Sequence, residues 1–307
     1  MRVLVTGATG FVGGNLVPAL CDAGHDVVAL VRDPARYDAP DDVTVVTGDL
    51  LDPETLPPAF DGVDAAYYLV HSMQSGEDFE DRDRRAARNF VDAADAVGVS
   101  RVVYLGGLGE ERDRLSEHLR SRREVERLLE EGAFELTTLR AAIIVGAGSA
   151  SFRMVHQLVK RLPVMVTPKW VSTPCQPIAI DDVVAYLVGV LDAPETAGRT
   201  FEIGGPDVLT YRGMLETTAR VTGQRLRVVP VPVLSPELSA YWVGLVTDVP
   251  KGVARPLIAG LRNPVVVTDD SITDHVDVEL TPFETAVREA LAADPAAPTP
   301  VTVEEPA

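Results

Sequence analysis

The sequence predicts an α/β fold built on a doubly wound parallel sheet, with a small C-terminal lobe. Three observations predict it. A glycine-rich segment joins an apolar run to an amphipathic helix at the very start of the chain. Short apolar runs then alternate with helical patterns through the first half, as parallel strands with crossover helices require. After about residue 146 the pattern becomes irregular and rich in proline.

The first strand is expected at residues 1–5, followed by a glycine motif and a helix that begins near Gly14. In a Rossmann turn, Gly7 permits the tight bend, Gly10 lets the backbone approach a diphosphate, and Gly13 lets the helix pack closely on the strand. The helix N-terminus adds free N–H groups and the positive end of its dipole. The strand and helix on either side favour a dinucleotide site over a simple tight turn. The expected cofactor-binding residues of this motif are Gly7, Thr9, Gly10, Phe11, Val12 and Gly13.

The other elements follow as apolar runs and periodic patterns. Expected strands are residues 27–31, 43–46, 63–70, 101–105, 136–145 and 201–206, and expected helices are 79–97, 114–131 and 178–191. On the helix at 79–97, the residues expected to face the sheet are Phe79, Ala86, Phe90, Ala93, Ala94 and Val97.

The domain organisation follows from this change of pattern. We expect residues 1–146 to form the NAD(P)-binding core, with 171–204 returning to it. Residues 147–170 and 205–293 then form a substrate or lid lobe over the carboxyl ends of the strands, where ligands of open α/β sheets bind. Residues 294–307, rich in proline, alanine and acid, are expected to be a disordered tail.

The charge of the chain narrows the classes of partner. A net charge of −18 disfavours nucleic acid and anionic membrane surfaces, because both bind basic patches. Lys160, Lys169 and Lys251 are the only lysines among 28 basic residues. Abundant acid with so little lysine is typical of a halophilic protein, and the alternative is a GC-rich genome with an acidic proteome.

Composition also sets expectations for compartment and metal. Cys21 and Cys175 are isolated, so neither a disulfide framework nor a metal site is expected. The chain begins with a strand rather than a signal peptide, and charges and prolines interrupt the apolar stretch at 238–261. We therefore expect a cytoplasmic protein without an integral membrane segment, acting on a small molecule. A homo-oligomer is an open possibility.

The residue after the second strand distinguishes the two nicotinamide cofactors. Arg32 lies nineteen residues after Gly13, and its guanidinium can clamp a ribose 2′-phosphate. This favours NADP(H). The adjacent Asp33 could serve a 2′-hydroxyl instead, so NAD(H) remains possible.

Two further strand ends complete the expected cofactor pocket. Asp49 could accept a hydrogen bond from the adenine amino group, with Leu50 against the adenine face. The alternative is a loop acid that caps the next segment. Leu69, Val70 and His71 end the fourth strand, where they should lie beside the nicotinamide.

These residues together resemble the extended and atypical short-chain dehydrogenase/reductases. The glycine motif, Gly48-Asp49-Leu50 and the segments 139–146 and 177–183 carry the resemblance. Further runs are most similar to the YbjT-like branch, which is related to NmrA-like proteins and to the accessory NADPH-binding subunit of respiratory complex I. Those runs are 68–73, 118–122 and 144–150. The resemblance covers about residues 1–290 and implies a Rossmann fold with a bound NAD(P).

The chain departs from the family at the catalytic positions. Active members carry Tyr-x-x-x-Lys, whereas no tyrosine here has a lysine four residues later, and the serine position falls at Gly106 or Gly107. The same helix instead offers His118 and Arg122 one turn apart. A neutral imidazole beside a guanidinium is a plausible base. The alternatives are a polar contact to ribose or substrate, and a solvated helix face.

The sequence therefore favours an NADPH-dependent reductase of a small organic or quinone-like substrate. Four residues could line its pocket, or simply form the core of the lobe: Trp170, Tyr241, Trp242 and Leu245. One alternative is a non-catalytic NADP(H)-binding redox sensor or assembly subunit. A second is an enzyme like the nucleotide-sugar epimerases and dehydratases, which normally needs the missing tyrosine.

Overall fold

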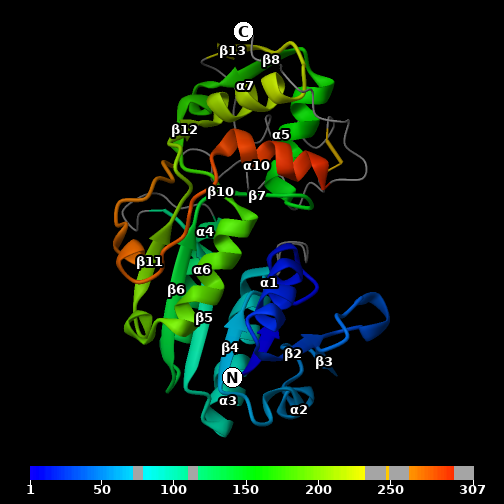
Figure 1. Cartoon of the computed structure of the whole chain (residues 1–307), viewed down its shortest axis with the longest axis vertical. Helices are drawn as coiled ribbons and strands as arrows, with labels where there is room; N and C mark the ends of the chain where they lie inside the picture. Colours follow the sequence, from blue (N-terminus) through cyan, green and yellow to red (C-terminus); the bar gives the residue numbers. More distant parts are fainter. Residues whose placement is uncertain (72–78, 110–116, 232–246, 249–262, 294–307) are drawn as a thin grey trace.

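The molecule has a sheet-based core and a smaller lobe beyond one end of the sheet (Figure 1). The computed structural model describes residues 1–71, 79–109, 117–231, 247–248 and 263–293. Some expectations fall outside what the structure describes: the pocket role of Tyr241, Trp242 and Leu245, the tail at 294–307, and the side chains of His118 and Trp170.

The core is a seven-stranded, fully parallel sheet in the order β11-β6-β5-β4-β1-β2-β3. Its strands are β1 (Arg2–Thr6), β2 (Asp26–Val31), β3 (Thr44–Thr47), β4 (Ala65–Tyr68), β5 (Arg101–Gly107), β6 (Glu135–Ala141) and β11 (Thr200–Ile203). The order reverses between β1 and β4, which defines the topological switch point of a Rossmann sheet. The doubly wound parallel sheet is therefore confirmed.

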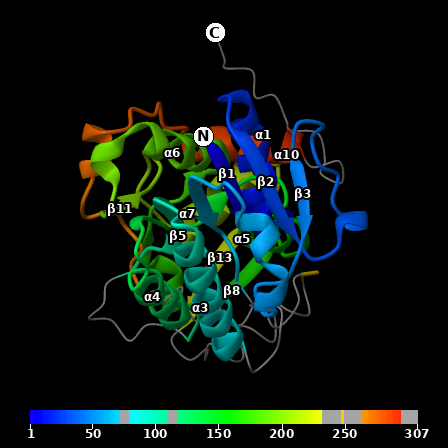
Figure 2. The ribbon, with the colours of Figure 1, turned by 90° about the horizontal axis from the view of Figure 1, so that it is seen from below.

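Helices cover both faces of the sheet (Figure 2). One face carries α1 (Phe11–Asp22) and α6 (Ile180–Asp192), and the other carries α2 (Pro57–Phe60), α3 (Phe79–Val97) and α4 (Glu117–Leu129). Because both faces are buried, strand residues alternate between two apolar clusters. Val3 and Val5 join the cluster under α1 and α6, whereas Leu4 joins the one under α3 and α4.

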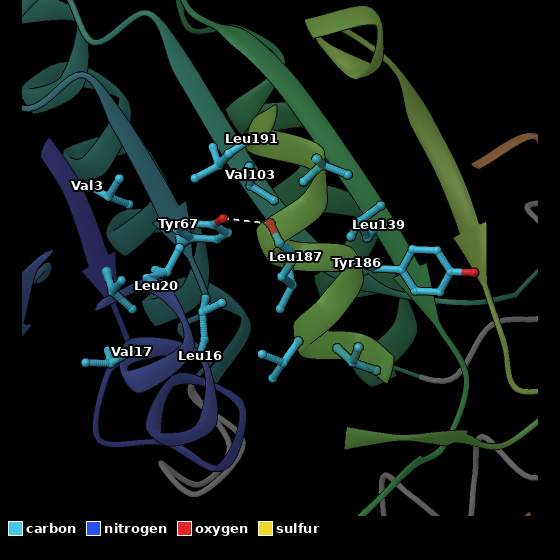
Figure 3. Close-up of a cluster of buried hydrophobic side chains, with 14 of the residues drawn as sticks. Val3, Leu16, Val17, Leu20, Tyr67, Val103, Leu139, Tyr186, Leu187 and Leu191 are labelled. Carbon is cyan, nitrogen blue, oxygen red and sulfur yellow. Dashed lines mark hydrogen bonds between the residues drawn. The ribbon is translucent and has the colours of Figure 1, made fainter. Parts of the chain in front are cut away.

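Tyr67 anchors α6 to the sheet from the centre of the first of these clusters. It is fully buried on β4, and its hydroxyl donates a 2.7 Å hydrogen bond to the carbonyl of Leu187 (Figure 3). Burial raises the pKa of this phenol far above its usual value. The ring is thus a structural part of the core.

In its described residues, the lobe is built from short strand pairs and three helices. Its pairs are β7 (Ile144–Val145) with β10 (Ile178–Ala179), β8 (Val164–Pro168) with β13 (Arg227–Val231), and β9 (Pro174–Cys175) with β12 (Leu209–Thr210). Its helices are α5 (Ala150–Arg161), α7 (Tyr211–Val221) and α10 (Phe283–Ala292). They surround a third apolar cluster, in which Cys175 and Met214 place their sulfur atoms 3.4 Å apart.

The expected single strand at 136–145 is wrong. β6 ends at Ala141, and Ile144–Val145 pairs in parallel with Ile178–Ala179 in a separate sheet. The expected helix at 178–191 accordingly begins two residues later, at Ile180. Residues 136–145 contain no glycine or proline to mark the break, so only the pairing with a distant segment defines it.

Two helices differ in detail from the sequence-based expectation. α1 begins at Phe11 rather than near Gly14, because Gly10 occupies the N-cap position with an extended backbone. α3 has the expected bounds, but its buried face differs at its end: Val97 is 48% exposed, whereas Val91 is buried.

We predict that Tyr67→Phe lowers the free energy of unfolding by about 1 kcal/mol, because the buried Leu187 carbonyl loses a hydrogen bond at nearly constant volume. Urea unfolding followed by circular dichroism measures this change. Tyr37→Phe, on a half-buried ring, is the control and should change stability less. Equal midpoints for the wild-type protein and Tyr67→Phe would show that the hydroxyl stabilises nothing.

Candidate functional site

The turn between β1 and α1 contains glycines at positions where any side chain would force neighbouring backbone atoms to move. Gly7 has a φ of +80°, and a Cβ added to it would lie 2.8 Å from the carbonyl oxygen of Leu69. A Cβ on Gly13 would lie 2.3 Å from the carbonyl oxygen of Gly7. The helix therefore sits directly on the turn, and the chain leaving β4 presses against the same turn.

The same turn presents main-chain donors to any ligand above it. Gly10 caps α1 without a side-chain hydrogen bond to the first turn, and no acidic residue lies in that turn. Thr9 and Gly10 are exposed, while Phe11 and Val12 are half-buried. The first N–H groups of a helix and its positive dipole end favour an anion. The turn thus fits a diphosphate.

The expected cofactor residues lie at one edge of the sheet. Arg32, Asp49 and Leu69 follow β2, β3 and β4, which flank β1 in the strand order β4-β1-β2-β3. The carboxyl ends of parallel strands share an edge, so these residues and the glycine turn are brought together. Val70 is half-buried and His71 is exposed at the exit of β4.

The segment after β3 is held firmly in place. The Asp49 N–H donates to the Thr55 hydroxyl at 3.0 Å, and the Asp49 carboxylate accepts from the Leu51 N–H at 3.0 Å. Leu50 is only 6% exposed, and its carbonyl accepts a 2.7 Å hydrogen bond from Asn89 of α3. Asp49 is half-buried at this edge, whereas Leu50 belongs mainly to the apolar cluster under α3.

Arg32 and Asp33 have different roles after β2. The Asp33 carboxylate accepts from the Ala35 N–H at 3.1 Å and caps the short helix η1 (Pro34–Arg36). Arg32 is exposed, as is Arg36 in the last turn of η1. The arrangement gives this corner two guanidinium groups. Sequence reasoning missed Arg36, although its spacing of four residues from Arg32 was a usable signal.

The candidate catalytic helix α4 begins at the same edge. His118 is in its first turn, and its side chain lies outside the described part of the chain. Arg122 is half-buried, and its carbonyl accepts a 3.1 Å hydrogen bond from the Tyr104 hydroxyl. Burial raises the pKa of Tyr104, and the nearby Arg122 charge opposes that shift. Arg122 therefore lies close to Tyr104, in the middle of β5.

The tyrosines near this edge point into the core. Tyr68 and Tyr104 lie on adjacent strands at the same register, buried under α3 and α4. Burial raises the pKa of Tyr68 far above its usual value. Gly106 and Gly107 end β5, so neither of the two residues expected at the family's serine position carries a hydroxyl. Within the described residues, these two phenols are poorly placed to transfer a proton.

A buried ion network lies beneath the ends of β5 and β6, and sequence reasoning missed it. Glu126 of α4 is 4% exposed and pairs with Arg140 at 2.5 Å and Arg123 at 3.3 Å. Arg123 also donates to the carbonyl of Gly109 at 2.6 Å. The network therefore fixes the chain just after β5 to α4 and β6. Only the i, i+3 spacing within α4 was visible in the sequence, because Arg140 lies on the next strand, β6, and no fixed spacing relates a helix residue to a strand residue.

Phe11 links the glycine turn to the lobe. A Cβ on Gly146 would lie 2.9 Å from the Phe11 ring, and one on Gly148 would lie 3.5 Å from it. Ser149 follows as the N-cap of α5, and its hydroxyl donates to the carbonyl of Ile144 at 2.7 Å. The first residue of α1 is thus in contact with the segment that enters the lobe.

Other kinds of site are not found in the described ranges. There, no group of three or more His, Cys, Asp and Glu residues is arranged to hold a metal ion. Burial raises the pKa of Cys175 to about 12, which makes it a poor nucleophile. Among the described helices, none is both long and apolar enough to cross a bilayer.

Comparison with known proteins agrees with this geometry. A family model described as NAD(P)H-binding matches residues 7–160. The chain is 31% identical to a (4-alkanoyl-5-oxo-2,5-dihydrofuran-3-yl)methyl phosphate reductase from Streptomyces griseus, covering 73% of this chain and 75% of that protein. It is 27% identical to a mitochondrial NADH dehydrogenase [ubiquinone] 1 alpha subcomplex subunit 9 from Arabidopsis thaliana, covering 91% and 74%.

The fold likeness extends to solved structures. The chain aligns with the crystal structure of the triphenylmethane reductase of Citrobacter sp. in complex with NADP(H), with a TM-score of 0.77 and 21% identity. The alignment covers 94% of this chain and all of that one. The expected extended short-chain dehydrogenase/reductase type is confirmed.

We predict that Gly13→Ala weakens NADPH binding, whereas Gly14→Ala, at the next position of the chain, does not. The new Cβ of Gly13→Ala collides with the Gly7 carbonyl, whereas that of Gly14→Ala lies 3.9 Å from the Ala8 carbonyl, an ordinary contact. Gly13→Ala should weaken NADPH binding at least about tenfold, or about 1.4 kcal/mol. Gly14→Ala should bind normally and gain up to roughly 1 kcal/mol of stability from helix propensity.

Fluorescence titration with NADPH and urea unfolding test this pair together. If Gly13→Ala binds NADPH as the wild-type protein does, the close packing of α1 on the turn has no role in binding.

Proposed function

Because this chain is a member of the NAD(P)H-binding family, we propose that it is a reductase that uses NADPH to reduce a small organic or quinone-like molecule. The observation that carries the proposal is the glycine turn, which opens at the switch point of the sheet with uncapped main-chain donors. NADP(H), when bound, supplies the hydride. The protein's task is then to hold the nicotinamide and the acceptor in a productive orientation.

Arg32 supports NADP(H) as the preferred cofactor. Its exposed guanidinium stands at the end of β2, with Arg36 four residues later, while the neighbouring Asp33 carboxylate is already used to cap η1. A 2′-phosphate would gain charge-assisted hydrogen bonds here, whereas a 2′-hydroxyl would face two cations. We assign the remaining cofactor contacts to the glycine turn, Asp49, Leu50 and the residues Leu69, Val70 and His71.

The related reductase from Streptomyces griseus supports the reductase assignment. The acid/base group must differ from that of typical family members, because the sequence has no Tyr-x-x-x-Lys pair and Tyr68 and Tyr104 are buried in the core. We assign proton transfer to His118 and a ribose or substrate contact to Arg122. Both lie on the first turns of α4, which starts at the carboxyl edge of the sheet.

A second candidate is a non-catalytic NADP(H)-binding subunit that senses redox state or supports an assembly. The absence of the Tyr-x-x-x-Lys pair from the sequence favours it, and the Arabidopsis relative is by name a subunit of a larger complex. A third, epimerase-like activity is weaker, since that chemistry normally uses the tyrosine that this chain lacks.

The acidic surface supports adaptation to high salt. The chain has 46 acidic and 28 basic residues, and molar KCl would screen the resulting repulsion. Assays of this protein are therefore best run in molar KCl as well as in dilute buffer.

We predict that Arg32→Ala weakens NADPH binding about tenfold or more and leaves NADH binding nearly unchanged, because only NADPH carries the 2′-phosphate. Fluorescence titrations with both nucleotides measure the change. Arg212→Ala, on α7 of the lobe, removes a cation paired with Glu216 and serves as the control. An equal loss for NADPH and NADH would exclude a 2′-phosphate contact.

The function itself is tested by following NADPH absorbance with a panel of quinones, aldehydes and imines. We expect at least one member to be reduced, and His118→Ala to lower kcat by about 10²-fold or more, in the range of general acid/base catalysis. Tight NADPH binding with no oxidation across the panel would instead support the binding-subunit candidate. Turnover that is unchanged in His118→Ala would remove the assigned role of that histidine.

A further inference from the structure

The strand pair of β8 and β13 exposes apolar side chains at the end of the lobe that lies away from the core sheet (Figure 1). Val164 and Val166 of β8 are 56% and 57% exposed. Val166 pairs in register with Val229, which is half-buried on the same face, whereas Met165 points the other way into the apolar cluster of the lobe. Neighbouring apolar side chains that are exposed together indicate an interaction surface.

Cations surround the amino ends of the same two strands. Lys160 lies in the last turn of α5, four residues before Val164, and the Arg227 N–H donates to the Pro163 carbonyl at 2.9 Å. Lys160, Arg225 and Arg227 are exposed, and within the described residues none of them forms an ion pair. We call this surface the lobe tip, and it consists of Lys160, Val164, Val166, Arg225 and Arg227.

Acidic residues are absent from the sequence around the lobe tip. Residues 136–180 and 217–236 contain no aspartate or glutamate, although the chain has 46 acidic residues. Among the described residues, Asp248 contacts α5 here and pairs with Arg161 at 3.2 Å, and Glu284 pairs with Arg220 of α7. These acids are therefore already neutralised, and the charge of the lobe tip is positive.

The positive lobe tip differs from the rest of the molecule, because the net charge of the chain is −18. The Debye length is about 8–10 Å at physiological ionic strength, so a surface that touches the lobe tip senses mainly the charges next to it. The expectation that the chain avoids anionic surfaces follows from its total charge, and it does not apply to this end of the lobe.

An apolar face bordered by unpaired cations is complementary to a surface that is both apolar and negatively charged. A second copy of the chain fits poorly, because a two-fold contact through this face would bring the cations of two lobe tips together. A protein partner fits less well, since valine is under-represented among the residues that anchor protein interfaces. The boundary between headgroups and acyl chains of an anionic bilayer meets both requirements.

We propose that the lobe tip binds the surface of a membrane that contains anionic lipid. Val164 and Val166 then lie at the level of the headgroups, and Lys160, Arg225 and Arg227 lie beside lipid phosphates. The contact is peripheral and does not depend on the proposed reductase activity. If the proposed function holds, the contact also brings the substrate lobe to the phase in which apolar, quinone-like molecules dissolve.

The test is co-sedimentation of the full chain with vesicles made of equal parts phosphatidylglycerol and phosphatidylcholine, or of phosphatidylcholine alone, in about 0.1 M KCl. The wild-type protein should sediment with the anionic vesicles only, and molar KCl should release it. Arg225→Gln with Arg227→Gln should weaken binding roughly 25-fold, about fivefold for each charge removed. Arg85→Gln with Arg88→Gln, at exposed positions of α3, is the matched control and should bind as the wild-type protein does.

The apolar part of the lobe tip is tested in the same assay. Val164→Ser with Val166→Ser should weaken binding to anionic vesicles about tenfold or more, because less apolar surface is then buried in the membrane. Val97→Ser, at a 48% exposed position of α3, is the control and should have no effect. All lobe-tip variants should keep the wild-type affinity for NADPH.

Several outcomes would overturn the proposal. They are wild-type protein that ignores anionic vesicles or sediments equally with neutral ones, and equal losses in the two arginine pairs. A dimer in light scattering that Val164→Ser with Val166→Ser converts to a monomer, without vesicle binding, assigns the lobe tip to a second copy instead. Urea midpoints show whether each variant is folded, and Arg225→Lys with Arg227→Lys, which keeps both charges, should bind normally.

The two proposals can fail separately. A chain that binds NADPH and reduces a substrate but ignores anionic vesicles contradicts the membrane contact alone. A chain that binds anionic vesicles through the lobe tip but neither binds nor oxidises NADPH contradicts the proposed function alone.

Discussion

The contact between Gly13 and the carbonyl of Gly7 is the constraint on which the cofactor edge depends. It brings α1 so close to β1 that even a methyl group would collide, and this closeness aims the first N–H groups of the helix across the switch point. Gly7 in turn packs against Leu69, which fixes the exit of β4 to the same turn. Two backbone contacts thus fix the relative positions of β1, α1 and the exit of β4. Phe11, the first residue of α1, adds a contact with the lobe at Gly146.

The proposed cofactor edge lies next to β5 and α4, which lack the serine and the Tyr-x-x-x-Lys pair expected for typical family members. β5 ends in two glycines, and its tyrosine is turned into the core, where the hydroxyl binds a carbonyl of α4. The network of Arg123, Glu126 and Arg140 holds the segment after β5 in place. Removing only the Glu126 carboxylate would leave two cations unneutralised in a buried setting, so this network is expected to be far more sensitive to substitution than the exposed ion pairs.

Local signals allowed much of this to be predicted from the sequence. The spacing of three glycines between a strand and a helix located the turn, and periodicity gave the bounds of α3 without error. Features set by distant segments could not be predicted. The break at Ala141 depends on Ile144–Val145 pairing with Ile178–Ala179. The role of Glu126 likewise depends on which charges the fold brings close, a property that no spacing encodes.

Hydrogen–deuterium exchange of the full chain, with and without saturating NADPH, tests most directly whether main-chain amides of the glycine turn hold the diphosphate. We predict strong protection of peptides that cover residues 7–13, with smaller protection at 32–36, while peptides of α7 stay unchanged. If NADPH binds and the exchange of residues 7–13 is unaltered, the dinucleotide is held elsewhere and the role assigned to the glycine turn is contradicted.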